Sequence, residues 1–259
     1  MLSYQHNYHA GNAADVHKHA LLATTLAYMT RKDKALTYME SHAGRGLYDL
    51  SDAAARRTGE SDAGVTRLLT RFPPDHPWRE TVERTRAIHG STAYPGSPLI
   101  AQHLLRRFDS IELAELHPQE YARLVEAMPK APNTRLHKRD GLEMAKALTP
   151  PDPRRGCLMI DPSWEMRDDY GTLAKLVPLI HRKWNVGVIL LWYPLLADQR
   201  HKPMVSALRA AIPDLFISEV RFPPAQAHHG MQGSAMAVVN TPWGLEQAAQ
   251  DIAHIFERT

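Results

Sequence analysis

The sequence predicts an α/β fold on a doubly wound, mostly parallel sheet that ends in an antiparallel hairpin. Short apolar runs typical of buried strands alternate with helical patterns along the chain, as in a parallel sheet. The first run, residues 35–40, leads into a small, glycine-rich turn at 41–46, which is the usual opening of such a sheet. The last two runs, 215–222 and 234–240, are separated only by a loop, so we expect them to pair antiparallel.

The elements follow in a regular order. A helix is expected to begin after Asn12, which can cap its first turn, and Asp15 suits the positive end of the helix dipole. The charged residues 31–34 close this helix before the first strand. The sequence predicts the four central strands that follow at residues 110–116, 134–138, 157–160 and 186–192.

Residues 50–92 have a different character. They show amphipathic helical patterns and a Phe72-Pro73-Pro74 break, and strand-like runs are absent. We interpret them as a helical insertion subdomain within one larger domain, formed by residues 1–49 and 93–259.

Composition excludes several classes of protein. With 259 residues, 44% hydrophobic and 23% charged, the chain is neither disordered nor of low complexity. The single cysteine, Cys157, excludes an internal disulfide framework and fits a reducing compartment. The longest apolar uncharged run, 184–197, is shorter than the roughly 20 residues of a membrane helix and is interpreted as a buried strand. The N-terminus has no apolar signal-peptide core, so we expect a cytoplasmic protein with no membrane association.

Polar residues follow three successive predicted strands. Gly44 and Gly46 follow the first strand, Glu115 ends the second and Asp140-Gly141 follows the third. Ligands of open α/β sheets bind at these carboxyl ends, where a carboxylate can hold ribose hydroxyls. A dinucleotide-binding fingerprint has a third glycine, which is missing here. Its acidic residue lies about 20 residues further on, whereas Glu115 lies 71 residues beyond Gly44. Without the 43-residue insertion, Gly44 and Glu115 are separated by 28 residues, which is a plausible spacing for a nucleoside-binding unit.

The fourth predicted strand along the chain, residues 157–160, runs directly into Asp161-Pro162-Ser163-Trp164. The exocyclic amine of adenine is a poor nucleophile because its lone pair is delocalised into the ring. The Asp161 side chain and the Pro162 carbonyl can accept its two hydrogens and favour a pyramidal nitrogen. The Trp164 ring can stack on the base once the base has left its own stack.

The chain resembles the bacterial ribosomal RNA large subunit methyltransferase J family, whose members transfer a methyl group from S-adenosylmethionine to adenine N6 in 23S rRNA. The shared motifs run nearly end to end. They are Met1-Leu2-Ser3-Tyr4, His6, His9-Ala10-Gly11-Asn12, Ala14-Asp15-Val16, Lys18-His19, His42-Ala43-Gly44 with Gly46, Arg57-Thr58-Gly59-Glu60, Tyr94-Pro95-Gly96-Ser97-Pro98-Leu99-Ile100-Ala101, Glu115-Leu116-His117-Pro118, Asp140-Gly141, Asp161-Pro162, Leu191-Trp192-Tyr193-Pro194 and Gly230-Met231.

The resemblance implies a Rossmann-like class I methyltransferase sheet and a role for each matching residue. Asp161, with Pro162 and Trp164, is the implied catalytic loop. The implied cofactor residues are Lys18, His19, His42, Gly44, Ser97, Glu115, Asp140, Gly141 and Asp161. The implied substrate residues are Tyr4, His6, Lys18, Ser163 and Trp164, the first two in a tail that orders on binding. The implied product is S-adenosylhomocysteine, and the implied partner is 23S rRNA or a large-subunit assembly intermediate.

One departure from the family affects the catalytic loop. The family motif reads Asp-Pro-Pro-Tyr, whereas this chain has Ser163 and Trp164. Tryptophan keeps a stacking face, and serine removes a φ constraint without removing the Pro162 carbonyl. We expect activity to survive with a looser loop.

The 15 histidines raise the question of a metal site. His17 and His19 are two residues apart on the expected helix, so they point about 200° from one another and cannot form a ligand pair. His228 and His229 are adjacent, which is awkward for shared ligation. We therefore expect no metal.

Three alternatives stay open. A DNA adenine-N6 methyltransferase would use the same chemistry, although no separate domain for reading duplex DNA is visible. A non-enzymatic nucleic-acid binder on a methyltransferase fold finds support only in Ser163, and a nicotinamide oxidoreductase fits less well.

The formal net charge of +3 permits a polyanionic partner without requiring one. Residues 130–155 carry seven Lys/Arg against three Asp/Glu, so we expect a basic surface near the Asp161 loop. A monomer is the default expectation.

Overall fold

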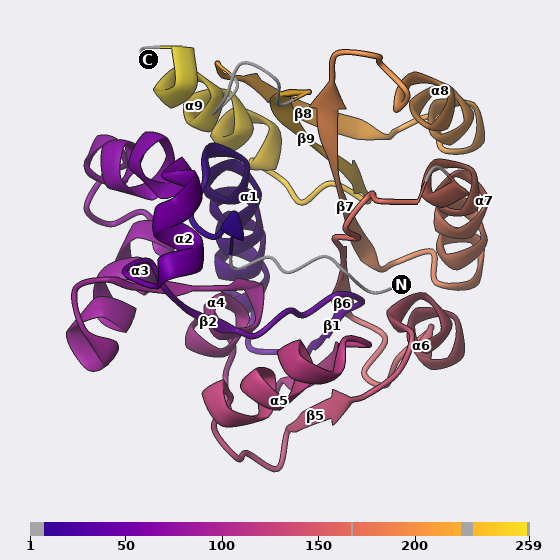
Figure 1. Cartoon of the computed structure of the whole chain (residues 1–259). Helices are drawn as coiled ribbons and strands as arrows, with labels where there is room; N and C mark the ends of the chain where they lie inside the picture. The colour runs from indigo at the N-terminus through magenta and orange to yellow at the C-terminus, as the bar shows by residue number, and fades with distance from the viewer. Residues whose placement is uncertain (1–7, 167, 224–229, 258–259) are drawn as a thin grey trace.

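The computed structural model describes residues 8–166, 168–223 and 230–257. Its centre is a seven-stranded sheet with the strand order β5-β4-β1-β6-β7-β9-β8 (Figure 1). These strands are β1 (Thr37–Glu40), β4 (Ser110–Ala114), β5 (Thr134–His137), β6 (Gly156–Ile160), β7 (Val188–Leu196), β8 (Phe216–Arg221) and β9 (Met231–Val239).

The pairing confirms the predicted mixed sheet. Strands β5, β4, β1, β6 and β7 are parallel, and β9 pairs antiparallel with both β7 and β8. The central strands β1 and β6 are fully buried, because helices cover both faces of the sheet. The apolar run 184–197 contains the whole of β7, so it is a buried strand as predicted. Within the described part of the chain, no helix has the length and apolar character needed to cross a membrane.

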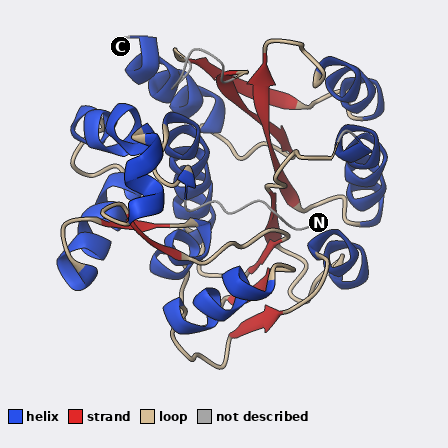
Figure 2. Cartoon of the chain, viewed as in Figure 1, coloured by secondary structure: helices blue, strands red, loops and turns tan. Residues whose placement is uncertain are grey.

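Helices pack in two layers, one on each face of the sheet (Figure 2). One layer contains α1 (Ala13–Thr30), α3 (Pro77–His89), α4 (Ser97–Leu104) and α9 (Leu245–Glu257). The other contains α6 (Gly141–Leu148), α7 (Asp168–Lys183) and α8 (Lys202–Ala211), while α5 (Pro118–Ala127) lies beside β2 near the β5 end. Asn12 caps α1 as predicted, and its Oδ1 accepts the backbone N–H of Asp15 over 2.8 Å.

The described structure of residues 50–92 is helical. It comprises α2 (Ala53–Thr58), a π-helical turn at Asp62–Thr66, a 3-10 turn at Leu69–Arg71 and α3. Val65, Phe72 and Trp78 are buried in the same core cluster as α1, so this region packs against the main fold. We retain its division from the rest of the chain as a proposal.

A small second sheet was not predicted. Strands β2 (Leu47–Asp49) and β3 (Ala93–Pro95) pair antiparallel at the two borders of the helical region. Three residues are too few to show a period of two. Only the long-range pairing reveals these strands.

The prediction for the basic stretch 130–155 is wrong for its last part. Arg154 and Arg155 directly precede β6, whereas Asp161 follows it, so the two arginines lie at the opposite edge of the sheet. Contacts confirm this position, since the Arg155 guanidinium donates to the carbonyl of Lys34, which precedes β1. Sequence proximity misled the prediction, because a strand carries the chain from one edge of the sheet to the other.

Candidate functional site

A pocket of about 480 Å³ opens at the carboxyl ends of β1, β4 and β6. Every predicted site residue in the described chain lines it. These residues are Lys18, His19, His42, Gly44, Ser97, Glu115, Asp140, Gly141, Asp161, Pro162, Ser163 and Trp164. Tyr4 and His6 lie outside the described residues. The sheet topology therefore brings together side chains that are up to 146 residues apart in the sequence.

Two glycines shape the floor of the pocket. Gly44 follows β1 with a φ of +63°, a backbone conformation that other residues rarely adopt. Gly141 opens α6 so close to β1 that an added Cβ would lie 1.7 Å from the Ser41 carbonyl oxygen. The turn after β1 and the start of α6 therefore meet backbone to backbone.

Two acids lie on either side of this floor. Glu115 accepts the backbone N–H of Gly44 over 2.8 Å and that of His117 over 2.7 Å, one on each carboxylate oxygen. Burial raises the pKa of Glu115, although these two hydrogen bonds oppose the shift. Asp140 caps α6 through Oδ1, which accepts the backbone N–H groups of Leu142 and Glu143. Each carboxylate oxygen of Glu115 accepts through one of its two lone pairs, so a second lone pair stays available to a ligand.

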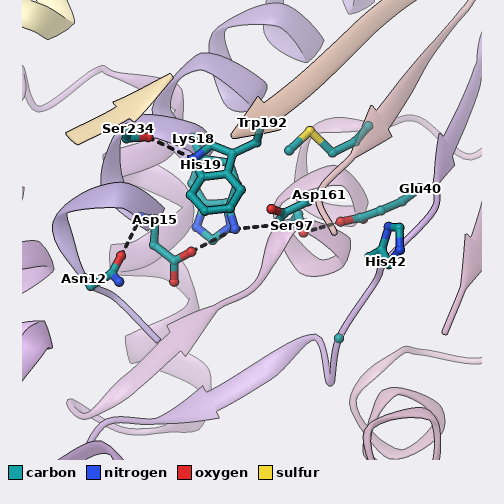
Figure 3. Close-up of polar contacts among 12 residues, drawn as sticks. Asn12, Asp15, Lys18, His19, Glu40, His42, Ser97, Asp161, Trp192 and Ser234 are labelled. Carbon is teal, nitrogen blue, oxygen red and sulfur yellow. Dashed lines mark hydrogen bonds and ion pairs between the residues drawn. The ribbon is translucent and has the colours of Figure 1, made fainter. Parts of the chain in front are cut away.

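Lys18 links α1 to the Asp161–Trp164 loop. Its Nζ lies 2.5 Å from Asp161 Oδ2 and 2.9 Å from Asp15 Oδ1 (Figure 3). The Lys18 side chain is 4% exposed, and those of Asp15 and Asp161 are 2% and 13% exposed. Burial by itself lowers the pKa of Lys18, but the two carboxylates outweigh it, so the pKa is raised. One ammonium group therefore serves two carboxylates in a nearly dry environment.

Glu40 ends β1 beneath the pocket and is completely buried. Its carboxyl group accepts hydrogen bonds from the hydroxyls of Ser97 and Tyr38, the latter over 3.0 Å. Burial raises the pKa of Glu40 to about 8, against the opposing effect of these two hydrogen bonds. Glu40 is therefore protonated near neutral pH and fixes the Ser97 hydroxyl at the start of α4.

The two histidines predicted to line the cofactor site, His19 and His42, bond to different partners. His19 Nδ1 shares a 2.8 Å hydrogen bond with the Tyr94 hydroxyl, and His42 Nδ1 shares one of 2.7 Å with the Ser41 hydroxyl. Burial lowers the pKa of His42, which keeps its imidazole neutral. His17 points away toward β8 and β9, as its spacing from His19 implies. No group of three His, Cys, Asp or Glu side chains among the described residues is placed to hold a metal ion.

The loop after β6 places Ser163 and Trp164, its two departures from the family motif, differently. Ser163 is exposed, whereas Trp164 is 6% exposed and its ring centroid lies 4.5 Å from that of Tyr170. Trp164 has a φ of +58°, which is uncommon for a bulky side chain. Stacking of this ring on a base stays a prediction.

Sequence reasoning missed three residues of the site. The Trp192 ring lies over the Lys18 ammonium, 5.3 Å from Nζ to the ring centroid, and its Nε1 donates to Ser234 Oγ over 2.8 Å. Asp15 was interpreted only as a favourable charge in the first helical turn, and Glu40 only as the end of a strand. A carboxylate at the end of an otherwise apolar strand was the available signal for Glu40.

The pocket is strongly acidic. Its described lining contains one lysine, Lys18, and no arginine. Eight acids line it: Asp15, Glu60, Glu115, Glu120, Asp140, Asp161, Glu165 and Asp169. Several of them are compensated, as Glu120 is by Arg45 at 2.6 Å. The remaining charge favours a cationic ligand over an anionic one.

Comparison with known proteins identifies the family. A family model described as "Ribosomal RNA large subunit methyltransferase D, RlmJ" matches residues 33–259. Ribosomal RNA large subunit methyltransferase J of Escherichia coli is 38% identical, with 97% of this chain and 91% of that protein covered. The protein of the same name from Haemophilus influenzae is 35% identical, with 100% and 94% covered.

Solved structures agree in fold. The crystal structure of protein LPL1258 from Legionella pneumophila has a TM-score of 0.85 at 30% identity and covers 95% of this chain and 92% of its own. A probable spermidine synthase from Corynebacterium glutamicum, with a TM-score of 0.53 at 10% identity and coverage of 93% and 71%, shares the fold alone. The sheet order and its antiparallel end are those of a Rossmann-like methyltransferase. This chain belongs to the ribosomal RNA large subunit methyltransferase J family.

Proposed function

We propose that this protein transfers a methyl group from S-adenosylmethionine to the N6 atom of one adenine in 23S rRNA. The observation that carries the proposal is the placement of Asp161, at the end of β6, in a pocket that also contains every predicted cofactor residue in the described chain. Family membership supports the reaction class and the RNA substrate.

The pocket suits the proposed cofactor. S-adenosylmethionine carries a sulfonium and an ammonium group, and an acidic pocket stabilises both. When bound, the cofactor supplies an electrophilic methyl group. Gly44 and Gly141 would allow its close approach to the backbone, Glu115 would accept its ribose hydroxyls, and Asp140 would face its adenine. His19, His42 and Ser97 complete the proposed cofactor site.

Lys18 and Asp161 have complementary roles in this proposal. Lys18 donates a hydrogen bond to Asp161 Oδ2, which holds the orientation of the carboxylate. The other oxygen, Oδ1, would then accept one hydrogen of the target amine, and the Pro162 carbonyl would accept the second. Together the two acceptors localise the nitrogen lone pair toward the methyl donor.

The substrate adenine would enter from the exposed side of the loop. Because the bond to be formed involves N6, the base must leave its own stack, at a cost of a few kcal/mol. Ser163 lies at the exposed side of the loop, and the Trp164 and Trp192 rings line the pocket behind it. We assign Tyr4 and His6 to the substrate side on the family resemblance, and we propose no metal in the reaction.

The test is mass mapping of 23S rRNA methylation with and without the purified protein. We expect one N6-methyladenine to depend on the protein, and Asp161→Asn to lower its rate of formation at least a hundredfold while calorimetry shows retained S-adenosylmethionine binding. Asp168→Asn, an exposed acid in the first turn of α7, is the matched control and should keep full activity. Methylation of duplex DNA in place of rRNA would overturn the substrate assignment. RNA binding without any methylation would overturn the enzyme assignment.

A further inference from the structure

The proposed RNA substrate raises a question of charge. RNA is a polyanion, and basic side chains supply most of the affinity of proteins for its phosphates. The pocket that would receive the adenine is lined by eight acids and one lysine among the described residues. Its walls therefore repel the phosphates that flank the target adenine, which favours phosphate contacts on surfaces outside the pocket.

Cations gather at the opposite edge of the sheet. Seven of them lie in three segments that precede β1, β4 and β6, and we call these residues the basic edge: Arg31, Lys32, Lys34, Arg106, Arg107, Arg154 and Arg155. The same segments contain three acids, Asp33, Asp109 and Asp152. The basic edge, with these acids counted, therefore has a net charge of +4, while the remaining 24 Lys/Arg and 25 Asp/Glu of the chain give −1.

Hydrogen bonds fasten the three segments into one surface. The Arg106 guanidinium donates to the carbonyls of Lys32 and Lys34 over 2.7 and 2.9 Å and pairs with Asp109 at 2.9 Å. The Arg155 guanidinium donates to the Lys34 carbonyl over 3.0 Å and to that of Met29. These two arginines therefore hold the backbone, and they leave Arg31, Lys32, Lys34, Arg107 and Arg154 exposed to solvent.

A cleft and exposed aromatic rings accompany this charge. A cleft of about 210 Å³ lies between Tyr28, Arg31, Lys32, Arg155, Val186 and Pro242. The neighbouring Trp243 is 82% exposed, which is exceptional for tryptophan in a folded protein. Phe108 is 52% exposed, and the Arg106 guanidinium carbon lies 4.4 Å from its ring centroid. Cations interleaved with exposed rings are typical of surfaces that bind unpaired RNA, where the rings stack on bases.

We propose that the basic edge is a second RNA-binding surface, which contacts phosphates and unstacked bases of the same rRNA away from the target adenine. This proposal rests on the proposed function for the identity of the RNA. Strands β1 and β6 have four and five residues, so they separate the two edges by only about 13–17 Å. An RNA that continues beyond the target loop can therefore reach both. Anionic membranes also bind basic surfaces with exposed tryptophan, and the RNA substrate proposed above favours RNA as the partner here.

The test compares two variants of equal net charge. Arg31→Glu/Lys32→Glu/Arg107→Glu changes exposed residues of the basic edge, and Arg84→Glu/Arg123→Glu/Lys175→Glu changes exposed residues on α3, α5 and α7. Binding to protein-free 23S rRNA is measured at several salt concentrations, as is binding to a 20-nucleotide strand that carries the mapped adenine.

We expect the basic-edge variant to lose at least tenfold in affinity for 23S rRNA, and its salt slope to fall by about 2, since each lost phosphate contact removes about 0.7–0.9. The control variant, binding of the short strand and S-adenosylmethionine affinity should stay within twofold of wild type. Trp243→Ala should cost a further several-fold on 23S rRNA without changing the salt slope.

Two results would overturn the inference. One is a basic-edge variant whose affinity and salt slope for 23S rRNA equal those of the control. The other is a stronger effect of these substitutions on binding to phosphatidylglycerol vesicles than on binding to rRNA. Failure of the proposed function looks different, because wild type would then form no N6-methyladenine whether or not the basic edge binds RNA.

Discussion

Removal of the Lys18 ammonium group tests how the Asp161 carboxylate is held. Lys18→Met keeps most of the side-chain volume and removes the only cation within 3 Å of both Asp15 and Asp161 in the described structure. Two carboxylates then face one another in surroundings where Asp15 is 2% and Asp161 13% exposed. Each must either stay ionised without this cation or take up a proton.

The magnitude follows from this burial. Breaking a buried ion pair by deleting one partner typically costs about 3–5 kcal/mol, because it leaves an uncompensated charge. At about 2 °C per kcal/mol for a chain of this length, we expect the transition temperature to fall by about 6–10 °C. Asp15→Asn with Lys18→Met leaves one carboxylate in place of two, so the double variant should regain part of the lost stability.

The assay is urea unfolding between pH 5 and pH 8, read by tryptophan fluorescence. In the variant each carboxylate that stays ionised lacks the Lys18 cation, and protonation at lower pH relieves this penalty, so the variant loses stability relative to wild type as pH rises. The free energy of unfolding of the variant should therefore lie only slightly below that of wild type at pH 5 and furthest below it at pH 8. A deficit under 1 kcal/mol at every pH would refute the view that Lys18 neutralises both acids.

Three further predictions concern buried groups. Burial raises the pKa of Glu40 to about 8 in the folded state. Its contribution to stability is therefore full below about pH 4.5 and is lost as pH rises to 8. Glu40→Gln should remove this loss in urea unfolding. His17 has its pKa lowered by burial to about 3, so stability is lost as pH falls from 6.5, and His17→Gln should flatten that acid limb, with the opposite sign to Glu40. Gly141→Ala should destabilise the protein by about 1–3 kcal/mol and weaken S-adenosylmethionine binding in calorimetry, since its Cβ would meet the Ser41 carbonyl. Gly171→Ala, which has open space on its helix, is the matched control and should be neutral or slightly stabilising.

The parts of the fold that depend on local pattern were predictable. The Asn12 cap, the strands at 157–160 and 215–222 and the terminal hairpin each leave a signal within a few neighbouring residues. The two short strands β2 and β3 leave none, because they exist only through pairing across about 45 residues. The basic stretch 130–155 failed for a related reason, since its prediction used distance along the chain where distance across the sheet decides.

The site was predictable as a set of residues but not as a network. Strand-end positions identified Glu115, Asp140 and Asp161, and the family motifs added Lys18. That Lys18 Nζ lies 2.5 Å from Asp161 could not be predicted, because it depends on how α1 packs across the ends of the strands.

Helix α1 explains why so much of the site comes from a few residues. Asn12, Asp15 and Lys18 follow one another at intervals of three, which places them on one side of the helix. This side is polar and yet buried, which is unusual for a helix that packs on a core. The polar contacts run without a break from Glu60, which accepts the Asn12 amide over 3.0 Å, through Asp15 and Lys18 to Asp161. A buried polar helix face is costly for folding alone, and in this fold it joins the helical region at residues 50–92 to the carboxylate on which the proposed reaction depends.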